Sequence, residues 1–100
     1  MMKSLATMGV LALISGSAVA ADIAAGKRQS AMCGACHGAT GISAIPMYPN
    51  LAGQKALYLA KQLRDFKSGE RKDPVMSSMA MALSEADIEN LSAYYSNFKP

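Results

Sequence analysis

Both cysteines and the only histidine of the 100-residue chain lie within one short stretch, Cys33-Gly-Ala-Cys36-His37. Any chemistry that requires sulfur or imidazole ligands starts there. A structural zinc site needs four such ligands, and this stretch offers three, two of them adjacent. A thioredoxin-like dithiol opens a helix that follows a strand, where the helix dipole lowers the thiol pKa. Here we expect the cysteines to follow a helix, in a chain without strand signals, so both interpretations are disfavoured.

Cys-x-x-Cys-His is also the attachment signature of a c-type haem. Two thioether bonds to the haem vinyl groups hold one turn of backbone at the porphyrin edge, which places the residue after the second cysteine at the iron. Cys33 and Cys36 are therefore the expected attachment points of one haem c, and His37 is an expected axial ligand. We expect a carbonyl group of the following loop to fix the other ring nitrogen of His37.

The second axial position needs a different ligand, because the chain has no second histidine. Methionine, lysine, a terminal amine or water remain. Met76, Met79 and Met81 form a cluster, and we expect two of these three to be flexible core filler, the usual role of methionine. Pro74 favours an extended Asp73, and hence a loop around Met76 that can reach the haem. Met76 is therefore the favoured ligand, with Met79 as the alternative.

The first residues have the composition of a secretory signal peptide, expected over residues 1–20. Lys3 supplies a basic start, the run from Leu5 to Ala20 is uncharged, and its end is rich in small residues. The run is too short for a transmembrane helix. We expect a periplasmic protein without stable membrane insertion after cleavage, an uncleaved anchor being the alternative. Residues 21–100 then form a single domain. A domain of this size buries little apolar surface, so we expect a bound cofactor to contribute to its stability.

The charge pattern gives no sign of a nucleic-acid partner. The formal net charge is +3, or +2 once Lys3 is removed, which is far from the strongly basic balance of such proteins. Cationic residues dominate positions 55–72, and an acidic block of Glu85, Asp87 and Glu89 follows. We interpret both as solvated helix faces, a docking surface for an acidic partner being the alternative.

The spacing of apolar residues predicts three main helices and no strand. The first is expected over residues 24–32, capped by Asp22. The second spans residues 54–68 and ends at Gly69. The third opens at Ser84, where a capping side chain and acidic residues favour the same start. Its buried stripe is expected to consist of Ile88, Leu91, Tyr95 and Phe98, with Tyr94 beside it.

These features resemble class I cytochromes c, most closely the single-haem domains of the cytochrome c4 and bacterial cytochrome c553 type. The resemblance covers nearly all of residues 21–100. Its matching segments are Cys33-Gly-Ala-Cys-His-Gly38, Pro49-Asn-Leu-Ala-Gly-Gln54, Tyr58-Leu-Ala-Lys-Gln-Leu-Arg-Asp-Phe66, Gly69, Arg71, and Met76 seven residues before Leu83-Ser84, with Gly26 and Tyr94 in the terminal helices.

The resemblance implies the all-α cytochrome c fold, with three main helices and loops around one covalently attached haem. It implies that the first and last helices cross at Gly26 and Tyr94, and that Met76 is the second axial ligand. It also implies Pro46 as the proline that supports the axial histidine, with Pro49 as the alternative. Cytochrome c4 carries two such domains, whereas this chain has one haem motif, so a two-haem relay cannot be transferred to it.

A haem iron ligated by histidine and methionine has no open position, which favours outer-sphere electron transfer over catalysis. The expected protein is a non-enzymatic, diffusible periplasmic electron carrier of a respiratory chain. Its donor would be a quinol-oxidising complex or a dehydrogenase, and its acceptor a terminal oxidase or reductase. One alternative is the cytochrome subunit of a periplasmic dehydrogenase, such as a sulfide-oxidising flavocytochrome. Another is a periplasmic copper-binding protein that uses the methionine cluster.

Overall fold

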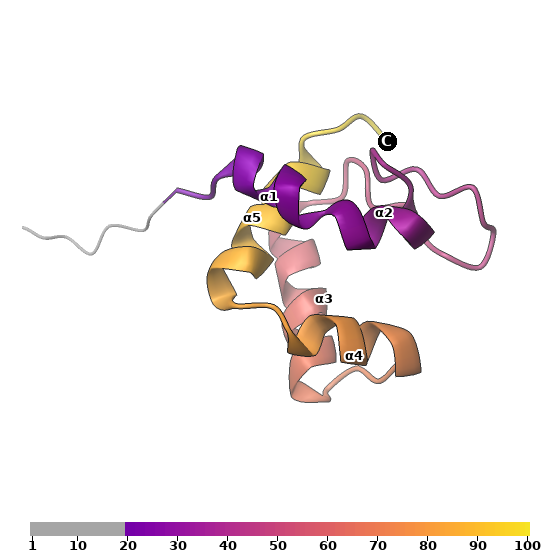
Figure 1. Cartoon of the computed structure of the whole chain (residues 1–100), viewed down its shortest axis with the longest axis vertical. Coiled ribbons are helices and arrows are strands. Elements are labelled where there is room, and N and C mark those ends of the chain that lie inside the picture. Colours follow the sequence, from indigo (N-terminus) through magenta and orange to yellow (C-terminus); the bar gives the residue numbers. More distant parts are fainter. Residues whose placement is uncertain (1–19) are drawn as a thin grey trace, which may run out of the picture.

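The computed structural model describes residues 20–100, so the expected signal peptide lies outside the described residues except for Ala20. The described part consists of helices and loops without a strand, which confirms the all-α prediction (Figure 1). It contains five helices, two more than the three main helices expected. None of the helices within residues 20–100 has the length and apolar character needed to cross a membrane. The helices are α1 (Ile23–Gln29), α2 (Ala31–His37), α3 (Ala56–Ser68), α4 (Pro74–Met81) and α5 (Glu85–Ser96).

The first predicted helix is in fact two helices. Asp22 caps α1 as predicted, since its carboxylate accepts the N–H of Ala25 at 3.1 Å. The chain bends at the buried Ser30, whose hydroxyl donates to the carbonyl of Lys27 at 2.8 Å, and α2 begins directly afterwards. The cysteines follow α1, as expected, but they lie within a second helix, α2, that was not predicted.

Helix α4 replaces the loop that we expected around Met76. Asp73 is extended, with φ −155° and ψ 129°, as a residue before proline should be. Its carboxylate accepts the N–H groups of Val75 and Met76 at 3.0 and 2.8 Å. Pro74 occupies the first helical position, where the missing N–H costs no hydrogen bond. The same Asp-Pro pair therefore starts a helix, and Met76 lies in its first turn.

Helices α1 and α5 cross where the sequence predicts. Gly26 is buried in α1, and a Cβ atom built on it would lie 2.2 Å from the carbonyl oxygen of Asn90 and 2.8 Å from the Cβ of Tyr94. The backbone N–H of Asp22 also donates to the side-chain oxygen of Asn90 at 2.8 Å. Only glycine allows the two helices to approach this closely, which confirms the crossing at Gly26 and Tyr94.

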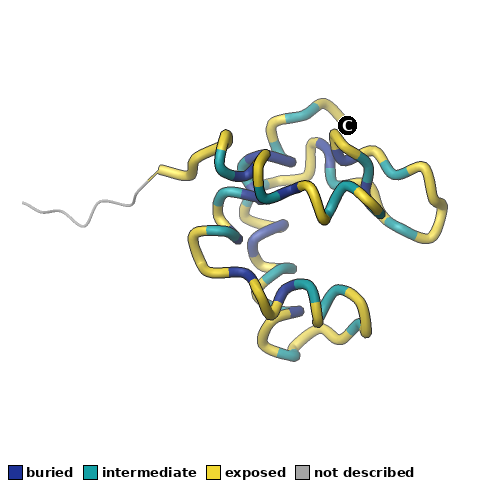
Figure 2. Tube along the Cα trace, in the orientation of Figure 1, coloured by how far each residue is buried: buried dark blue, intermediate teal, exposed yellow. Residues whose placement is uncertain are grey.

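Helix α5 begins with a reciprocal cap and supplies most of the core. The Ser84 hydroxyl accepts the N–H of Asp87 at 3.0 Å, and the Asp87 carboxylate accepts the N–H of Ser84 at 2.9 Å. Phe98 lies beyond the end of α5 and packs against the core, with its ring in a T-shaped contact with the ring of Tyr94. Many of the buried positions lie along α5, which packs against both α1 and α3 (Figure 2). The core cluster contains Leu59, Ala60, Leu83, Ile88, Leu91, Tyr94 and Tyr95.

Candidate haem-attachment site

Helix α2 presents the two thiols and ends at the imidazole. Cys33 and Cys36 are both free and half-buried, and their three-residue spacing places them on the same side of the helix, one turn apart. His37 is the last residue of α2 and only 7% exposed. The chain can turn away directly after it because Gly38 adopts φ 86°, in the left-handed region. A Cβ at Gly38 would lie 2.0 Å from the carbonyl oxygen of Ile42.

A single hydrogen bond fixes the orientation of the His37 ring. Its Nδ1 lies 2.8 Å from the carbonyl oxygen of Pro49. Because a carbonyl can only accept, Nδ1 carries the proton, and in the neutral ring the free lone pair is then on Nε2. Metal-ligating histidines commonly have this tautomer and this kind of partner. The predicted carbonyl from the following loop is therefore present. It belongs to Pro49, the alternative, and not to Pro46.

The loop that carries Pro49 is anchored to itself and to α5. The carbonyl of Gly41 accepts the N–H groups of Leu51 and Ala52 at 2.7 and 3.0 Å, which brings the two arms of the loop together. The Tyr94 hydroxyl donates to the carbonyl of Ala39 at 3.2 Å. At the far end of the loop, the N–H of Gly53 donates to the carbonyl of Tyr95 at 3.0 Å. The partner of His37 thus sits on a loop tied to the core at both ends.

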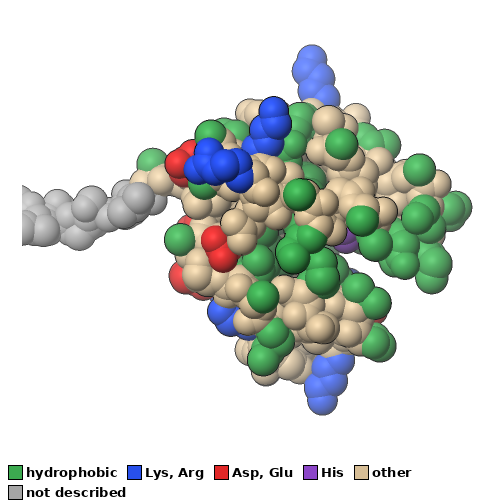
Figure 3. All heavy atoms as spheres, in the orientation of Figure 1, with side chains coloured by type: hydrophobic (Ala, Val, Ile, Leu, Met, Phe, Trp, Pro, Cys, Tyr) green, Lys and Arg blue, Asp and Glu red, His purple; other side chains and the backbone are tan. Residues whose placement is uncertain are grey.

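The chain segment that contains the motif carries no formal charge and several large apolar side chains. No Lys, Arg, Asp or Glu occurs between Arg28 and Lys55. Several large apolar side chains of this segment are exposed, with Met47 at 77% the most exposed. A hollow opens between the part that contains α2 and the part that contains α4, and the imidazole lies within it among hydrophobic side chains (Figure 3). Such an environment suits a large, mostly apolar cofactor.

The three methionines of α4 differ in their surroundings. Met76 and Met79 are half-buried and three residues apart, so they share one side of the helix. Met81 is 65% exposed and, two residues beyond Met79, points to a different side. With Met76 as the favoured ligand, we expected Met79 and Met81 to pack in the core. That expectation is wrong for Met81, whose side chain is largely exposed to solvent.

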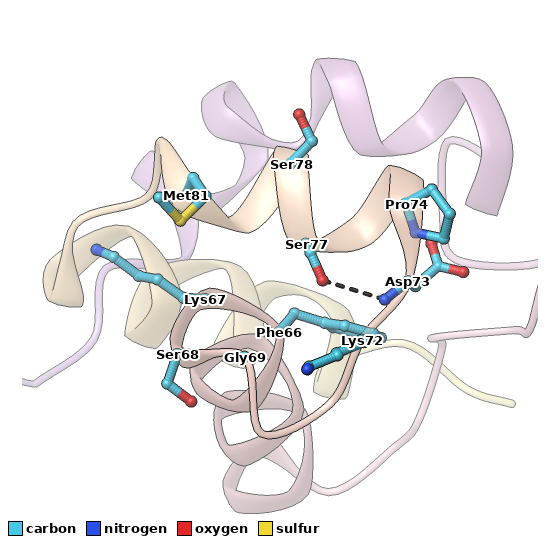
Figure 4. A pocket seen from close by; sticks show the side chains of 10 residues that line it. All are labelled: Phe66, Lys67, Ser68, Gly69, Lys72, Asp73, Pro74, Ser77, Ser78 and Met81. Atoms are coloured by element: carbon cyan, nitrogen blue, oxygen red, sulfur yellow. Dashed lines mark hydrogen bonds between the residues drawn. The ribbon is translucent and has the colours of Figure 1, made fainter.

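A second hollow lies between the end of α3 and α4, away from the thiols (Figure 4). Its lining includes Phe66, Lys67, Ser77 and Met81. Lys67 donates to the carbonyl of Leu83, and the Ser77 hydroxyl accepts the N–H of Asp73 at 3.1 Å. These polar side chains already have partners within the protein, and none of the motif residues lines the hollow, so it is not part of the candidate site.

The Cys33 thiol is poorly suited to redox exchange. Burial raises the pKa of the Cys33 thiol, whereas redox-active cysteines have a lowered pKa and a stabilised thiolate. Two thiols on one side of a short helix, followed by a buried imidazole with a free Nε2, instead fit thioether attachment and ligation. Fold and site together define an all-helical domain that attaches one c-type haem.

The comparisons with known proteins agree with this class. The family model for cytochrome c matches residues 23–99. The chain is 42% identical over 95 residues to cytochrome c4 of Pseudomonas aeruginosa, covering 95% of this chain and 46% of that protein. It is 45% identical over 98 residues to a thiosulfate dehydrogenase electron acceptor of Thiomonas intermedia, covering 97% of this chain and 43% of that protein. The crystal structure of reduced cytochrome c4 from Pseudomonas stutzeri superposes with a TM-score of 0.76, at 44% identity, covering 80% of this chain and 47% of that chain.

The chain therefore belongs to the cytochrome c family, and within it to the class I cytochromes of c4 type. The cytochrome c fold expected from the resemblance is confirmed, and so is one covalently bound haem c as its cofactor. The chain spans about half the length of the cytochrome c4 proteins that it matches.

Proposed function

We propose that this protein is a periplasmic one-electron carrier that holds its haem through Cys33 and Cys36 and ligates the iron with His37 and Met76. The observation that carries the proposal is the hydrogen bond from His37 Nδ1 to Pro49, which leaves Nε2 free beside two unpaired thiols. When bound, a c-type haem supplies a one-electron Fe(III)/Fe(II) couple. The name of the Thiomonas relative, an electron acceptor, supports the same kind of role.

His37 contributes orientation and basicity. The Pro49 carbonyl accepts the Nδ1 proton and so prevents the ring from presenting Nδ1 to a metal. The same bond makes the imidazole more electron-rich, which strengthens Nε2 as a ligand. Burial of the ring limits its access to water, and a low-dielectric environment strengthens each of these interactions.

Met76 is the proposed second ligand because its position is fixed at the start of α4. Its N–H is bonded to the Asp73 carboxylate at 2.8 Å, and its side chain is half-buried. A thioether is a soft, neutral ligand that favours Fe(II). With His37 and Met76 as its ligands, the iron would have no open position for a substrate, so we propose electron transfer without a catalytic role.

A pair of matched variants tests the choice of ligand. In the haem-loaded protein, Met76→Ala should remove the far-red absorption that methionine ligation gives ferric haem and produce a high-spin or ligand-exchanging spectrum. Met79→Ala, on the same side of the same helix, should leave both unchanged. The opposite result would assign the ligand to Met79, and an intact band in both variants would refute methionine ligation by either residue.

The charge-free segment around the motif is the proposed docking surface for redox partners. Met32, Ile42, Ile45 and Met47 are between 40% and 77% exposed there, and transient redox encounters use small interfaces, below about 1,200 Å² of buried area. A quinol-oxidising complex or a dehydrogenase would donate, and a terminal oxidase or reductase would accept. Since long-range steering needs charges, the second-order rate of transfer should change little with ionic strength.

A permanent cytochrome subunit of a periplasmic dehydrogenase, such as a sulfide-oxidising flavocytochrome, is the second candidate. The same exposed apolar side chains favour it, because stable interfaces have apolar cores. Gel filtration of native material separates the two proposals: a free carrier elutes at the size of one chain, and a subunit elutes in one larger species.

The first experiment is the visible spectrum of the native protein as isolated and after dithionite. Sharp low-spin bands that survive acid-acetone extraction would support covalent attachment. A colourless protein with two titratable thiols would instead favour the copper-binding alternative. The mass of the same material tests secretion, since removal of residues 1–20 should leave Ala21 at the N-terminus.

A further inference from the structure

We infer that Asn50 is a positioning residue for the axial imidazole, because its side chain holds the Pro49 carbonyl in place against His37. The inference rests on the proposed function, in which His37 ligates the iron. Asn50 is exposed on the loop, and it would act on His37 only through the Pro49 carbonyl.

The carbonyl that accepts the His37 proton belongs to the peptide group between Pro49 and Asn50. The pyrrolidine ring fixes φ at Pro49, but Pro49 has no N–H with which to anchor itself. The direction of its carbonyl therefore depends on what holds the next residue. That residue is held on two sides: Asn50 Oδ1 accepts the N–H of Ser43 at 2.7 Å, and the Asn50 carbonyl accepts the side-chain amide of Gln54 at 3.2 Å.

The bond to Ser43 is a link between the two arms of the loop close to Pro49. The backbone bonds from Leu51 and Ala52 to Gly41 close the loop on the other side of Asn50. Together they leave the Pro49–Asn50 peptide little room to rotate. The acceptor for the Ser43 N–H is the neutral side-chain amide of Asn50. It therefore adds no formal charge to the segment between Arg28 and Lys55, which has no charged residue.

Loss of the Asn50 acceptor should loosen the His37–Pro49 hydrogen bond without removing either partner. A weaker bond makes the imidazole less electron-rich and so stabilises Fe(III) less. The midpoint potential should therefore rise. The Nδ1 proton should also exchange with solvent faster, by about fivefold if roughly one net hydrogen bond is lost from the closed state.

The experiment uses the haem-loaded protein and the variant Asn50→Leu, which keeps the side-chain volume and removes the acceptor. NMR of the reduced protein measures exchange of the His37 Nδ1 proton, and a redox titration measures the midpoint potential. Asn50→Asp keeps an acceptor for the Ser43 N–H and should retain slow exchange; its added charge shifts the potential by itself, so only the proton is compared. Gln54→Met removes the second contact and should speed exchange to a smaller extent.

Ser84→Ala is the matched control, because it destabilises the fold at the cap of α5 without contacting the loop. It should change neither the exchange nor the potential. The inference is wrong if Asn50→Leu exchanges as slowly as the wild type, or if Ser84→Ala accelerates exchange equally. A wild-type protein without a covalently bound haem, or without an axial His37 in its NMR spectrum, would overturn the proposed function itself and is distinguishable from either result.

Discussion

Replacing Gly26 by alanine should destabilise the protein although alanine is the better helix former. In α1 the added methyl group would lie 2.2 Å from the Asn90 carbonyl oxygen and 2.8 Å from the Tyr94 Cβ. Neither neighbour can move alone, because one is backbone within α5 and the other is a buried side chain held by the core. The crossing helices must therefore separate.

The size of the effect follows from two opposing terms. Alanine in place of glycine gains about 1 kcal/mol of helix stability. Overpacking of a well-packed contact costs roughly 1–3 kcal/mol and sometimes more. The 2.2 Å approach requires a shift of about 1 Å, and a gap of that size forfeits a quarter to a half of the dispersion energy of the surrounding contacts. The overlap here involves backbone, so we expect the upper part of the cost and a net loss of about 2 kcal/mol.

Guanidinium unfolding of the haem-loaded protein, followed by far-ultraviolet circular dichroism, measures this change. Gly34→Ala is the matched control, since it is also a glycine within a helix and its added Cβ would only reach ordinary contact, 3.7 Å from the Cα of Ala39. It should be neutral or stabilise by up to about 1 kcal/mol. If Gly26→Ala unfolds at the same denaturant concentration as Gly34→Ala, the close crossing of α1 and α5 is refuted.

Three further variants test the fold. Ser84→Ala removes one half of the α5 cap and should lower the free energy of unfolding by about 1 kcal/mol; thermal unfolding that matches the wild type would contradict the cap. Arg64→Gln removes exposed ion pairs to Glu85 and Glu89 and should cost less than about 1 kcal/mol in denaturant titrations at low salt, and less still at high salt. Burial raises the pKa of Tyr95 above its ordinary 10.0, so the unfolded chain loses this proton first and stability falls as pH rises past that value. Tyr95→Phe should reduce the fall, measured as unfolding midpoints across alkaline pH, and an unchanged slope would assign it to other groups.

The parts of the fold that depend on neighbouring residues could be predicted from the sequence. Asp22 and Ser84 cap their helices through backbone amides a few positions away, and Gly69 ends α3 with φ 90°, which glycine adopts without strain. The contact of Gly26 with Tyr94 is distant in sequence, and only the resemblance to a known family suggested it.

Two features were missed for physical reasons. The segment of α4 is apolar over most of its length, so it shows no stripe to mark a helix, and the sequence analysis took Pro74 only as a constraint on Asp73. The Asp-Pro pair was itself the signal, since Asp caps and proline is favoured at the first helical position. The choice between Pro46 and Pro49 depends on how a long loop folds back to Gly41, which local spacing does not determine.

Tyr94 connects the stability of the fold to the geometry of the candidate site. Its Cβ lies against Gly26 at the crossing of α1 and α5, while its hydroxyl donates to the carbonyl of Ala39, two residues after His37. The next residue, Tyr95, accepts the N–H of Gly53 at the other end of the loop. One turn of α5 therefore contacts α1 and also binds both ends of the loop that carries Pro49. Since rotation of this turn would move all three together, we expect a change at the crossing of α1 and α5 to alter the orientation of the imidazole as well.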